Sequence, residues 1–296
     1  MFKGSLVALT TPFDSNNRVD YASLKGLIDF HVNEGTDGLV IAGTTGEAAT
    51  LSKSEHEELI ARAVDIVNGR MPVIAGTGSN STQQTIDLSL AVGKSGIDAY
   101  LVVVPYYNKP VQEGMFQHFS AIADAVEKPI MMYNVPGRTV ADMQAETVAR
   151  LAKHDNIFGI KEATGDIGRL RQIKALVDDD FRLYSGDDFT ALEFLENGGH
   201  GIVTVSGNVV PAAVARLCKL AAAGEHAQAR ALDDSLQALN DALFIESNPI
   251  PVKWALSQMG LIPPNLRLPL TQFANQYHDQ MRAALGAAGV NLEDAA

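Results

Sequence analysis

Eight short apolar segments recur along the chain, and the segments between them repeat apolar residues every three or four positions. The apolar segments lie at residues 5–9, 38–43, 72–76, 99–104, 129–133, 157–161, 181–185 and 201–205. Consecutive apolar positions are typical of strands that are buried on both faces of a parallel sheet. The intervening segments, among them 21–35, 54–69 and 82–96, have the period of amphipathic helices. Eight alternating strands and helices predict an α/β fold, a (β/α)8 TIM barrel.

The last quarter of the chain has a different pattern. After about residue 224 the strand-like segments stop, and the segments 223–246, 250–260 and 269–289 read as helix throughout. We therefore predict a catalytic barrel over residues 1–224 and a C-terminal helical domain over residues 225–296. No linker rich in Pro, Gly or Ser separates them, so the helical domain is expected to pack against the barrel. An open, doubly wound sheet is the alternative, but it carries a glycine-rich phosphate loop after its first strand, where this chain has LTTPFD.

The charge balance narrows the partners that this chain can be expected to have. Over 296 residues, 46% are apolar and 20% are charged, which indicates a soluble globular protein. The 23 basic and 35 acidic residues leave a net charge of −12, which repels nucleic-acid phosphates and anionic membranes. No segment approaches the roughly 18 apolar residues of a membrane helix, and the N-terminus lacks a signal-peptide pattern. We expect no nucleic-acid or membrane partner and a cytoplasmic location.

Neither a metal site nor a disulfide is indicated by the sequence. The seven histidines share no ligand spacing, and the segment HEELI at residues 56–60 has isoleucine where a zinc-binding helix needs its second histidine. Cys218 is the single cysteine, so it cannot form an internal disulfide, and its spacing predicts a buried position on a helix.

Polar side chains end several of the predicted strands, where a barrel of this kind carries its chemistry. Lys161 ends the segment 157–161, and apolar surroundings at the barrel mouth favour its neutral amine, the form that a Schiff-base nucleophile requires. An ion pair with Glu162 is the alternative interpretation. Tyr133 ends the neighbouring segment, where its phenol could transfer protons beside the lysine or simply pack its ring within the barrel.

Two further segments could hold an acidic substrate. Thr44 and Thr45, in the sequence GTTGE, offer two hydroxyls and a run of backbone amides that can bind a carboxylate through neutral donors. Arg138 follows Pro136 and Gly137 in a loop expected over the barrel mouth, where its guanidinium can bind a carboxylate with two hydrogen bonds. A surface ion pair is the alternative interpretation for Arg138.

Taken in order, the motifs of the chain resemble those of the dihydrodipicolinate synthase family, whose members are pyruvate-dependent lyases. The resemblance runs almost from end to end and rests on the segments GSLVALTTPF, GTTGEAATL, PVIAGTGSNST, PYYNKPVQEGMFQHF, YNVPGRT, GIKEATGD, YSGDD, GGHGIVTVSGNV and ESNPIPVKWAL. It implies an imine between Lys161 and pyruvate, which becomes an enamine and adds to L-aspartate-4-semialdehyde. The implied product is 4-hydroxy-tetrahydrodipicolinate, on the route to diaminopimelate and lysine, and no metal or organic cofactor is required.

The same resemblance implies roles in pyruvate binding and proton transfer. Thr44 and Thr45 would hold the pyruvate carboxylate and join Tyr133 in a proton relay. Tyr107 would complete that relay by crossing from the neighbouring subunit of a tight dimer. The family also implies a homotetramer built from two such dimers, with a homodimer as the alternative.

Three further residues are implied for the semialdehyde site. Arg138 would bind the carboxylate of the semialdehyde, while the main chain at Gly186 and Val203 would shape the pocket. An N-acetylneuraminate lyase or a keto-deoxy-sugar aldolase is the nearest alternative, and Arg138 argues against it because a polyhydroxylated aldehyde has no carboxylate at that place. A relative that only binds a ligand is disfavoured, because the chain keeps the lysine, both tyrosines and both threonines together.

Lysine-inhibited members of the family bind lysine near the dimer interface, and the resemblance implies a corresponding allosteric site. Its positions are Ala49, His56, Asn80, Gln84 and Tyr106. Gln84 stands where several relatives carry an acid, and Lys53 adds a positive charge where lysine would approach. Losing a carboxylate and gaining a cation both weaken the attraction for lysine. We therefore expect weak or absent feedback inhibition.

Overall fold

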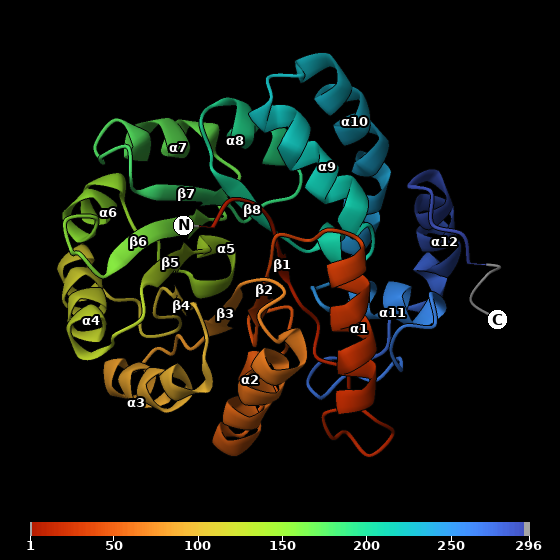
Figure 1. Ribbon diagram of the computed structural model, residues 1–296, viewed down its shortest axis with the longest axis horizontal. Coiled ribbons are helices and arrows are strands. Elements are labelled where there is room, and N and C mark those ends of the chain that lie inside the picture. Colours follow the sequence, from red (N-terminus) through yellow and green to blue (C-terminus); the bar gives the residue numbers. More distant parts are fainter. Residues whose placement is uncertain (1, 293–296) are drawn as a thin grey trace.

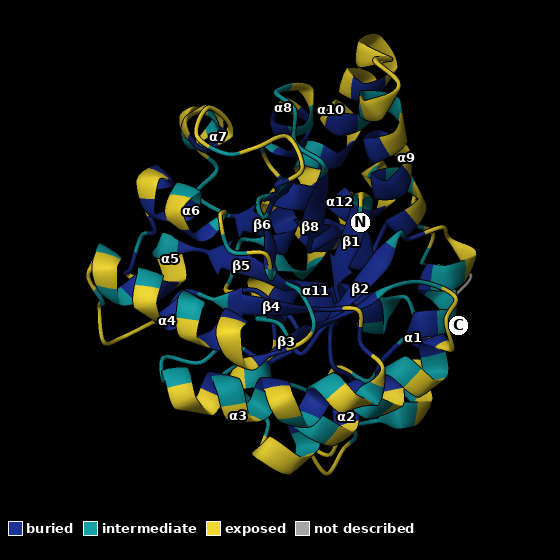
Figure 2. Ribbon diagram, turned by 60° about the vertical axis from the view of Figure 1, so that its left-hand side comes forward, coloured by how far each residue is buried: buried dark blue, intermediate teal, exposed yellow. Residues whose placement is uncertain are grey.

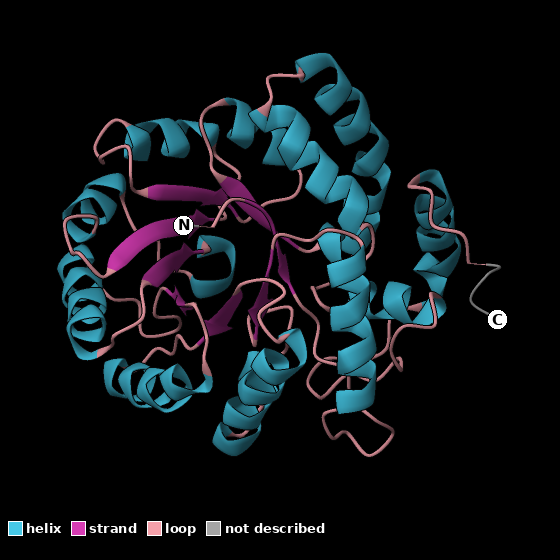
Figure 3. Ribbon diagram, viewed as in Figure 1, coloured by secondary structure: helices cyan, strands magenta, loops and turns pink. Residues whose placement is uncertain are grey.

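Eight parallel strands close into a barrel in chain order in the computed structural model, which describes residues 2–292. The strands are β1 (Gly4–Ala8), β2 (Gly38–Ile41), β3 (Val73–Gly76), β4 (Ala99–Val103), β5 (Ile130–Asn134), β6 (Ile157–Glu162), β7 (Arg182–Ser185) and β8 (Gly201–Thr204). Each strand pairs with its neighbour in sequence, and β1 completes the ring by pairing with β8. The strands form the centre of the molecule and helices surround them (Figures 1 and 3). The predicted TIM barrel is confirmed.

Helices alternate with the strands around the barrel. They are α1 (Tyr21–Asn33), η1 (Ala48–Thr50), α2 (Lys53–Val67), α3 (Thr82–Val92), η2 (Gly93–Ser95), α4 (Gln112–Ala125), α5 (Pro136–Thr139), α6 (Ala145–Leu151), α7 (Ile167–Lys174), α8 (Ala191–Glu196), η3 (Ser206–Asn208) and α9 (Pro211–Ala222). Asp20 caps α1 by accepting from two backbone N–H groups, and Ser52 and Glu55 form a reciprocal capping box on α2. Figure 2 shows that the helices of the ring turn buried faces to the strands and exposed faces outward.

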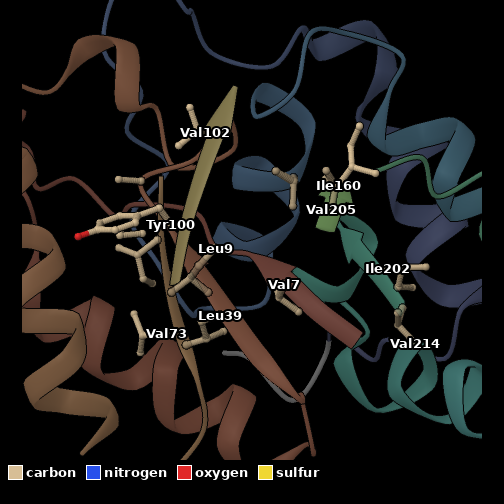
Figure 4. Close-up of a cluster of buried hydrophobic side chains, with 14 of the residues drawn as sticks. Val7, Leu9, Leu39, Val73, Tyr100, Val102, Ile160, Ile202, Val205 and Val214 are labelled. Atoms are coloured by element: carbon tan, nitrogen blue, oxygen red, sulfur yellow. The ribbon is translucent and has the colours of Figure 1, made fainter. Parts of the chain in front are cut away.

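The apolar core has two layers, which the strands separate. Inside the barrel, side chains such as Leu6 and Val40 pack against one another. Between the strands and the helices lies a larger cluster, part of which Figure 4 shows, and Val7 and Leu39 belong to it. Successive residues of a strand therefore point to opposite sides of the barrel wall. At the end of each strand, every second side chain enters the barrel mouth.

A helical extension follows the barrel. It comprises α10 (His226–Leu243), α11 (Ile250–Gln258), η4 (Asn275–Tyr277) and α12 (His278–Ala287), which gather on one side of the barrel in Figure 1. The prediction of helix is wrong for residues 244–246, 259–260 and 269–274, which lie outside the helices. Pro269 stands at the start of the last of these stretches, and proline lacks the N–H that a helix interior needs. The predicted division after residue 224 falls between α9 and α10 and stays a prediction.

Cys218 lies on α9 and is buried, as its spacing predicted. Burial raises the pKa of its thiol, so the reactive thiolate is disfavoured. This cysteine therefore packs as a small apolar residue between α9 and the barrel.

Candidate active site

Lys161 and Tyr133 stand side by side at the mouth of the barrel. Tyr133 on β5 is paired in register with Lys161 on β6, and Lys161 is paired in turn with Tyr184 on β7. Both tyrosines belong to the apolar cluster inside the barrel. Lys161 is 6% exposed, and its Nζ lies 4.3 Å from the centre of the Tyr133 ring. The predicted burial of a lysine amine beside a tyrosine is confirmed.

Glu162 does not pair with Lys161, because the alternation of the strand turns it to the other side of the barrel wall. Its Oε2 accepts a hydrogen bond from Asn134 Nδ2 over 3.0 Å, and its Oε1 accepts one from the Thr164 N–H over 2.8 Å. Burial raises the pKa of Glu162. Within residues 2–292, no carboxylate forms an ion pair with Lys161. The ion-pair interpretation of Lys161 is therefore wrong.

Gly186 follows β7 and lies directly against Lys161. Its N–H donates to the Glu162 carbonyl over 2.7 Å, which continues the pairing of β6 and β7. A Cβ at Gly186 would lie 2.6 Å from Lys161 Cε and 2.7 Å from Ala163 Cβ, closer than real side chains approach. Glycine therefore leaves the space that the lysine side chain occupies. Val203, on β8, is buried inside the barrel.

A buried carboxylate joins the ends of β7 and β8. Asp188 Oδ2 accepts hydrogen bonds from the N–H groups of Val205 and Ser206 over 2.8 and 3.0 Å. The Asp188 carbonyl accepts a further bond from Asn240 of α10 over 3.3 Å. Burial raises the pKa of Asp188, while the hydrogen bonds from Val205 and Ser206 favour its charged form. The motif SGDD indicated a polar strand end, but not that this acid would support the neighbouring strand.

The GTTGE turn after β2 presents the two threonines. Thr44 is partly exposed, and its carbonyl accepts a hydrogen bond from the Glu47 N–H over 3.1 Å. Thr45 is buried, and its Oγ1 accepts a hydrogen bond from Asn248 Nδ2 over 3.0 Å. Because that hydroxyl already accepts a bond, its own O–H remains to donate to an anion.

Arg138 lies on α5, a single helical turn where the sequence predicted a loop. Pro136 begins this turn, and its fixed φ suits the first position of a helix. Arg138 is exposed, and its Nη2 donates to the Asn248 carbonyl over 3.3 Å. No carboxylate of the described residues pairs with Arg138. The surface ion-pair interpretation is therefore wrong, and the binding of a substrate carboxylate by Arg138 stays a prediction.

Asn248 links the two residues predicted to bind carboxylates. Its side chain donates to Thr45, and its carbonyl accepts from Arg138. Its Oδ1 is buried and has no hydrogen-bond partner among the residues that the structure describes. Asn248 precedes α11 in the helical extension, far from both partners in sequence. Sequence analysis missed it, and the only signal was its presence in the segment ESNPIPVKWAL.

Residues 1–288 match the model of the Dihydrodipicolinate synthetase family. The chain belongs to this family. It is 55% identical over 290 residues to the 4-hydroxy-tetrahydrodipicolinate synthase of Pseudomonas aeruginosa, and the matched residues make up 98% of this chain and 99% of that protein. The fold matches the crystal structure of the chloride-inhibited dihydrodipicolinate synthase from Acinetobacter baumannii complexed with pyruvate, with a TM-score of 0.96. The two sequences are 48% identical, and the match covers 98% of this chain and 100% of that chain. A monomeric dihydrodipicolinate synthase variant is 39% identical, with a TM-score of 0.96 and coverage of 98% of each chain.

Tyr107 is exposed, whereas the other aromatic residue of the predicted relay, Tyr133, is buried. It is 87% exposed, in the loop after β4, and its backbone is left-handed with φ 73°. Among the described residues, no hydrogen bond joins Tyr107 to Tyr133. The role of Tyr107 in the relay therefore stays a prediction.

The allosteric site implied for the family falls on the segments that follow β2, β3 and β4. His56 is buried, Asn80 is partly buried, and Ala49, Gln84 and Tyr106 are exposed. His56 Nε2 lies 2.7 Å from the Gly76 carbonyl oxygen at the end of β3, and the Asn80 carbonyl accepts a hydrogen bond from Asn108 over 2.8 Å. Burial lowers the pKa of His56. Weak or absent inhibition by lysine stays a prediction.

Two kinds of feature are absent from the part of this synthetase-family chain that the structure describes. No group of three or more His, Cys, Asp or Glu side chains is arranged to hold a metal ion. None of its helices combines the length and apolar character needed to cross a membrane.

Proposed function

We propose that this chain is a lyase that condenses pyruvate with L-aspartate-4-semialdehyde to form 4-hydroxy-tetrahydrodipicolinate, a step of diaminopimelate and lysine biosynthesis. The observation that carries the proposal is the Lys161 amine, which is buried beside Tyr133 at the barrel mouth and forms no ion pair with residues 2–292. The names of the relatives support this substrate pair, since one carries the synthase name and another was crystallised with pyruvate.

The proposed reaction begins when Lys161 Nζ attacks the ketone carbon of pyruvate. The resulting carbinolamine loses water to give an imine, and the Tyr133 phenol carries the proton that this step moves. Loss of a methyl proton converts the imine to an enamine, whose carbon forms the new carbon–carbon bond with the aldehyde. The amino group of the second substrate then attacks the imine carbon, and Lys161 leaves as the free amine. One water molecule is released overall.

Both substrates carry a carboxylate, although the chain has a net charge of −12. Recognition must therefore come from local donors. In the proposal, Thr44 and Thr45 bind the pyruvate carboxylate, and Arg138 binds that of the semialdehyde. Gly186 leaves room for the lysine and its adducts, and the main chain at Val203 shapes the inner wall.

No metal or organic cofactor takes part in this proposed mechanism, because the covalent imine itself draws electrons from the reacting carbon. Tyr107 enters the site of a neighbouring subunit in a homodimer, or in a homotetramer built from two dimers. Its 87% exposure and left-handed backbone support this role, since such strain is kept where function requires it. A monomeric variant occurs among the similar structures, so sedimentation has to decide the assembly. A cytoplasmic location also belongs to the proposal.

The test of the covalent step is reductive trapping. The protein is mixed with pyruvate, reduced with borohydride and digested, and we expect an adduct on the peptide that contains Lys161. Lys161→Met is the control and should form none. A wild-type protein without any adduct would overturn the Schiff-base mechanism.

The identity of the second substrate is tested with Arg138→Ala. Loss of a charge-assisted contact should raise the KM of the semialdehyde about 10- to 100-fold, with a smaller effect on the KM of pyruvate. Turnover of an N-acetylated sugar aldehyde or a keto-deoxy-sugar precursor in preference to the semialdehyde would instead favour the aldolase alternative.

A further inference from the structure

A second buried lysine lies against the GTTGE turn and takes no part in the proposed chemistry. Lys253, on α11 of the helical extension, places its Nζ 2.6 Å from Oε1 of Glu47, the last residue of the turn. The two side chains are 0% and 1% exposed. The Lys253 Nζ also lies 4.3 Å from the centre of the Phe13 ring. The extension and the turn therefore share one fully buried ion pair, although 206 residues separate its members.

A buried ion pair of this kind adds little to the stability of a protein. Moving two charges from water into a protein interior costs about as much as their attraction returns, and apolar side chains of similar volume often serve as well or better. Burial lowers the pKa of Lys253, and the attraction of Glu47 opposes that shift. The pair instead fixes the orientation of the Glu47 carboxylate, because the hydrogen bond between them is short and charge-assisted.

Glu47 is restrained at both carboxylate oxygens and along its backbone. Lys253 binds Oε1, and the Arg267 N–H donates to Oε2 over 3.1 Å. The Glu47 backbone is left-handed, with φ 54°, and its N–H donates to the Thr44 carbonyl over 3.1 Å. A residue other than glycine keeps such a conformation only where its surroundings hold it. Holding the Glu47 side chain therefore holds the backbone that carries Thr44 and Thr45.

The same segment of the extension also holds the middle of the turn. Asn248 comes five residues before Lys253 in sequence, and its Nδ2 donates to Thr45 Oγ1 over 3.0 Å. Residues 248–253 therefore hydrogen-bond to two side chains of the turn, those of Thr45 and Glu47. A shift of α11 would move both threonines together.

We infer that Lys253 is a positioning residue for pyruvate, acting through Glu47 to set the place of the Thr44 and Thr45 hydroxyls. The inference rests on the proposed function, in which those hydroxyls bind the pyruvate carboxylate. Lys253 is fully buried, so it touches no substrate and acts only through Glu47. The helical extension then determines pyruvate affinity, although it follows the whole barrel in sequence.

The test compares three variants of the full chain with the wild type. Lys253→Met keeps most of the side chain and removes its charge, Glu47→Gln keeps the shape of its partner, and the double variant removes both charges. Met281→Ala is the matched control, because Met281 is fully buried on α12 and its truncation weakens the extension without touching the turn. The readouts are the KM of each substrate, the Tm, and the pyruvate concentration that half-saturates borohydride trapping at Lys161.

We expect Lys253→Met to raise both the pyruvate KM and the half-saturating concentration by about ten-fold or more, because small displacements of binding groups are costly. The semialdehyde KM should change by less than about two-fold. Glu47→Gln should have a smaller effect in the same direction, since its amide oxygen can still accept from Lys253. The double variant should regain the Tm lost by Lys253→Met, because no unpaired charge remains buried, and keep its raised pyruvate KM.

Two results would overturn the inference. In the first, the pyruvate KM of the double variant returns to the wild-type value together with its Tm. In the second, Lys253→Met raises the KM of both substrates equally, as a general loosening of the fold would. Met281→Ala should lower the Tm and leave the pyruvate KM unchanged. If Lys253→Met does not fold, Glu47→Gln supplies the comparison. A wild-type protein that traps no pyruvate would instead show that the proposed function itself is wrong.

Discussion

Tyr133 and Lys161 occupy facing positions on neighbouring strands, with Lys161 Nζ 4.3 Å from the centre of the Tyr133 ring. The parallel register of β5 and β6 brings both residues to the same level, and the two-residue period of a strand turns both into the barrel. The aromatic ring keeps water from one side of the amine. In the proposed mechanism this amine is the nucleophile and the phenol transfers protons.

Tyr133→Phe should separate these two roles, because it removes the hydroxyl and keeps the ring. We expect kcat to fall by about 100- to 10,000-fold, the usual range for a lost acid–base group, with little change in Tm. The direct measurement is the time course of borohydride trapping at saturating pyruvate, which should slow without losing its end point. A trapping rate equal to that of the wild type would contradict a role in imine formation.

Gly186→Ala should displace the lysine. The new methyl group would lie 2.6 Å from Lys161 Cε, so the side chain has to move, and we expect trapping to slow by about 100-fold. Gly26→Ala is the control, because none of the described residues comes within 4 Å of a Cβ there and Gly26 is exposed on α1. That control should keep full activity and gain about 0.5–1 kcal/mol of stability from the better helix propensity of alanine. Equal kinetics for the two variants would refute the close packing at Gly186.

Asp188→Ala should destabilise the fold through the end of β8. It leaves the buried N–H groups of Val205 and Ser206 without their acceptor, at a cost of about 2–4 kcal/mol in the free energy of unfolding. Equilibrium unfolding in urea measures this cost. Asp234→Ala removes an exposed acid on α10 and should stay within about 0.5 kcal/mol of the wild type. A loss of similar size in both variants would mean that Asp188 has no special role.

Two of the buried histidines should make the protein sensitive to mild acid. Burial lowers the pKa of His31 and of His118 from 6.5 to about 4. Between these values the unfolded chain binds protons that the folded chain does not, so stability is full above pH 6.5 and falls as the pH drops towards 4. Each histidine accounts for about 3 kcal/mol at the lower end of that range. Urea unfolding at several pH values should show a shallower decline for His118→Gln, and an unchanged decline would contradict the assignment.

The sequence pattern was sufficient to predict the barrel and the position of Lys161 within it. Strands covered by helices on one side and by packed side chains on the other must be apolar throughout, which is why eight such segments could be found without a structure. The position of Lys161 at a strand end, and its direction into the barrel, follow from the same pattern. Motif order identified the family, and the family model over residues 1–288 confirmed it.

Only the tertiary structure showed how the helical extension contacts the barrel mouth. Asn248 meets Thr45 across 203 residues and Lys253 meets Glu47 across 206, and no local period indicates either contact. Local patterns report on neighbours in sequence, because they reflect which face of one helix or strand is buried. Contacts between the extension and the turn depend instead on where α11 packs, which is set by the fit of many side chains at once.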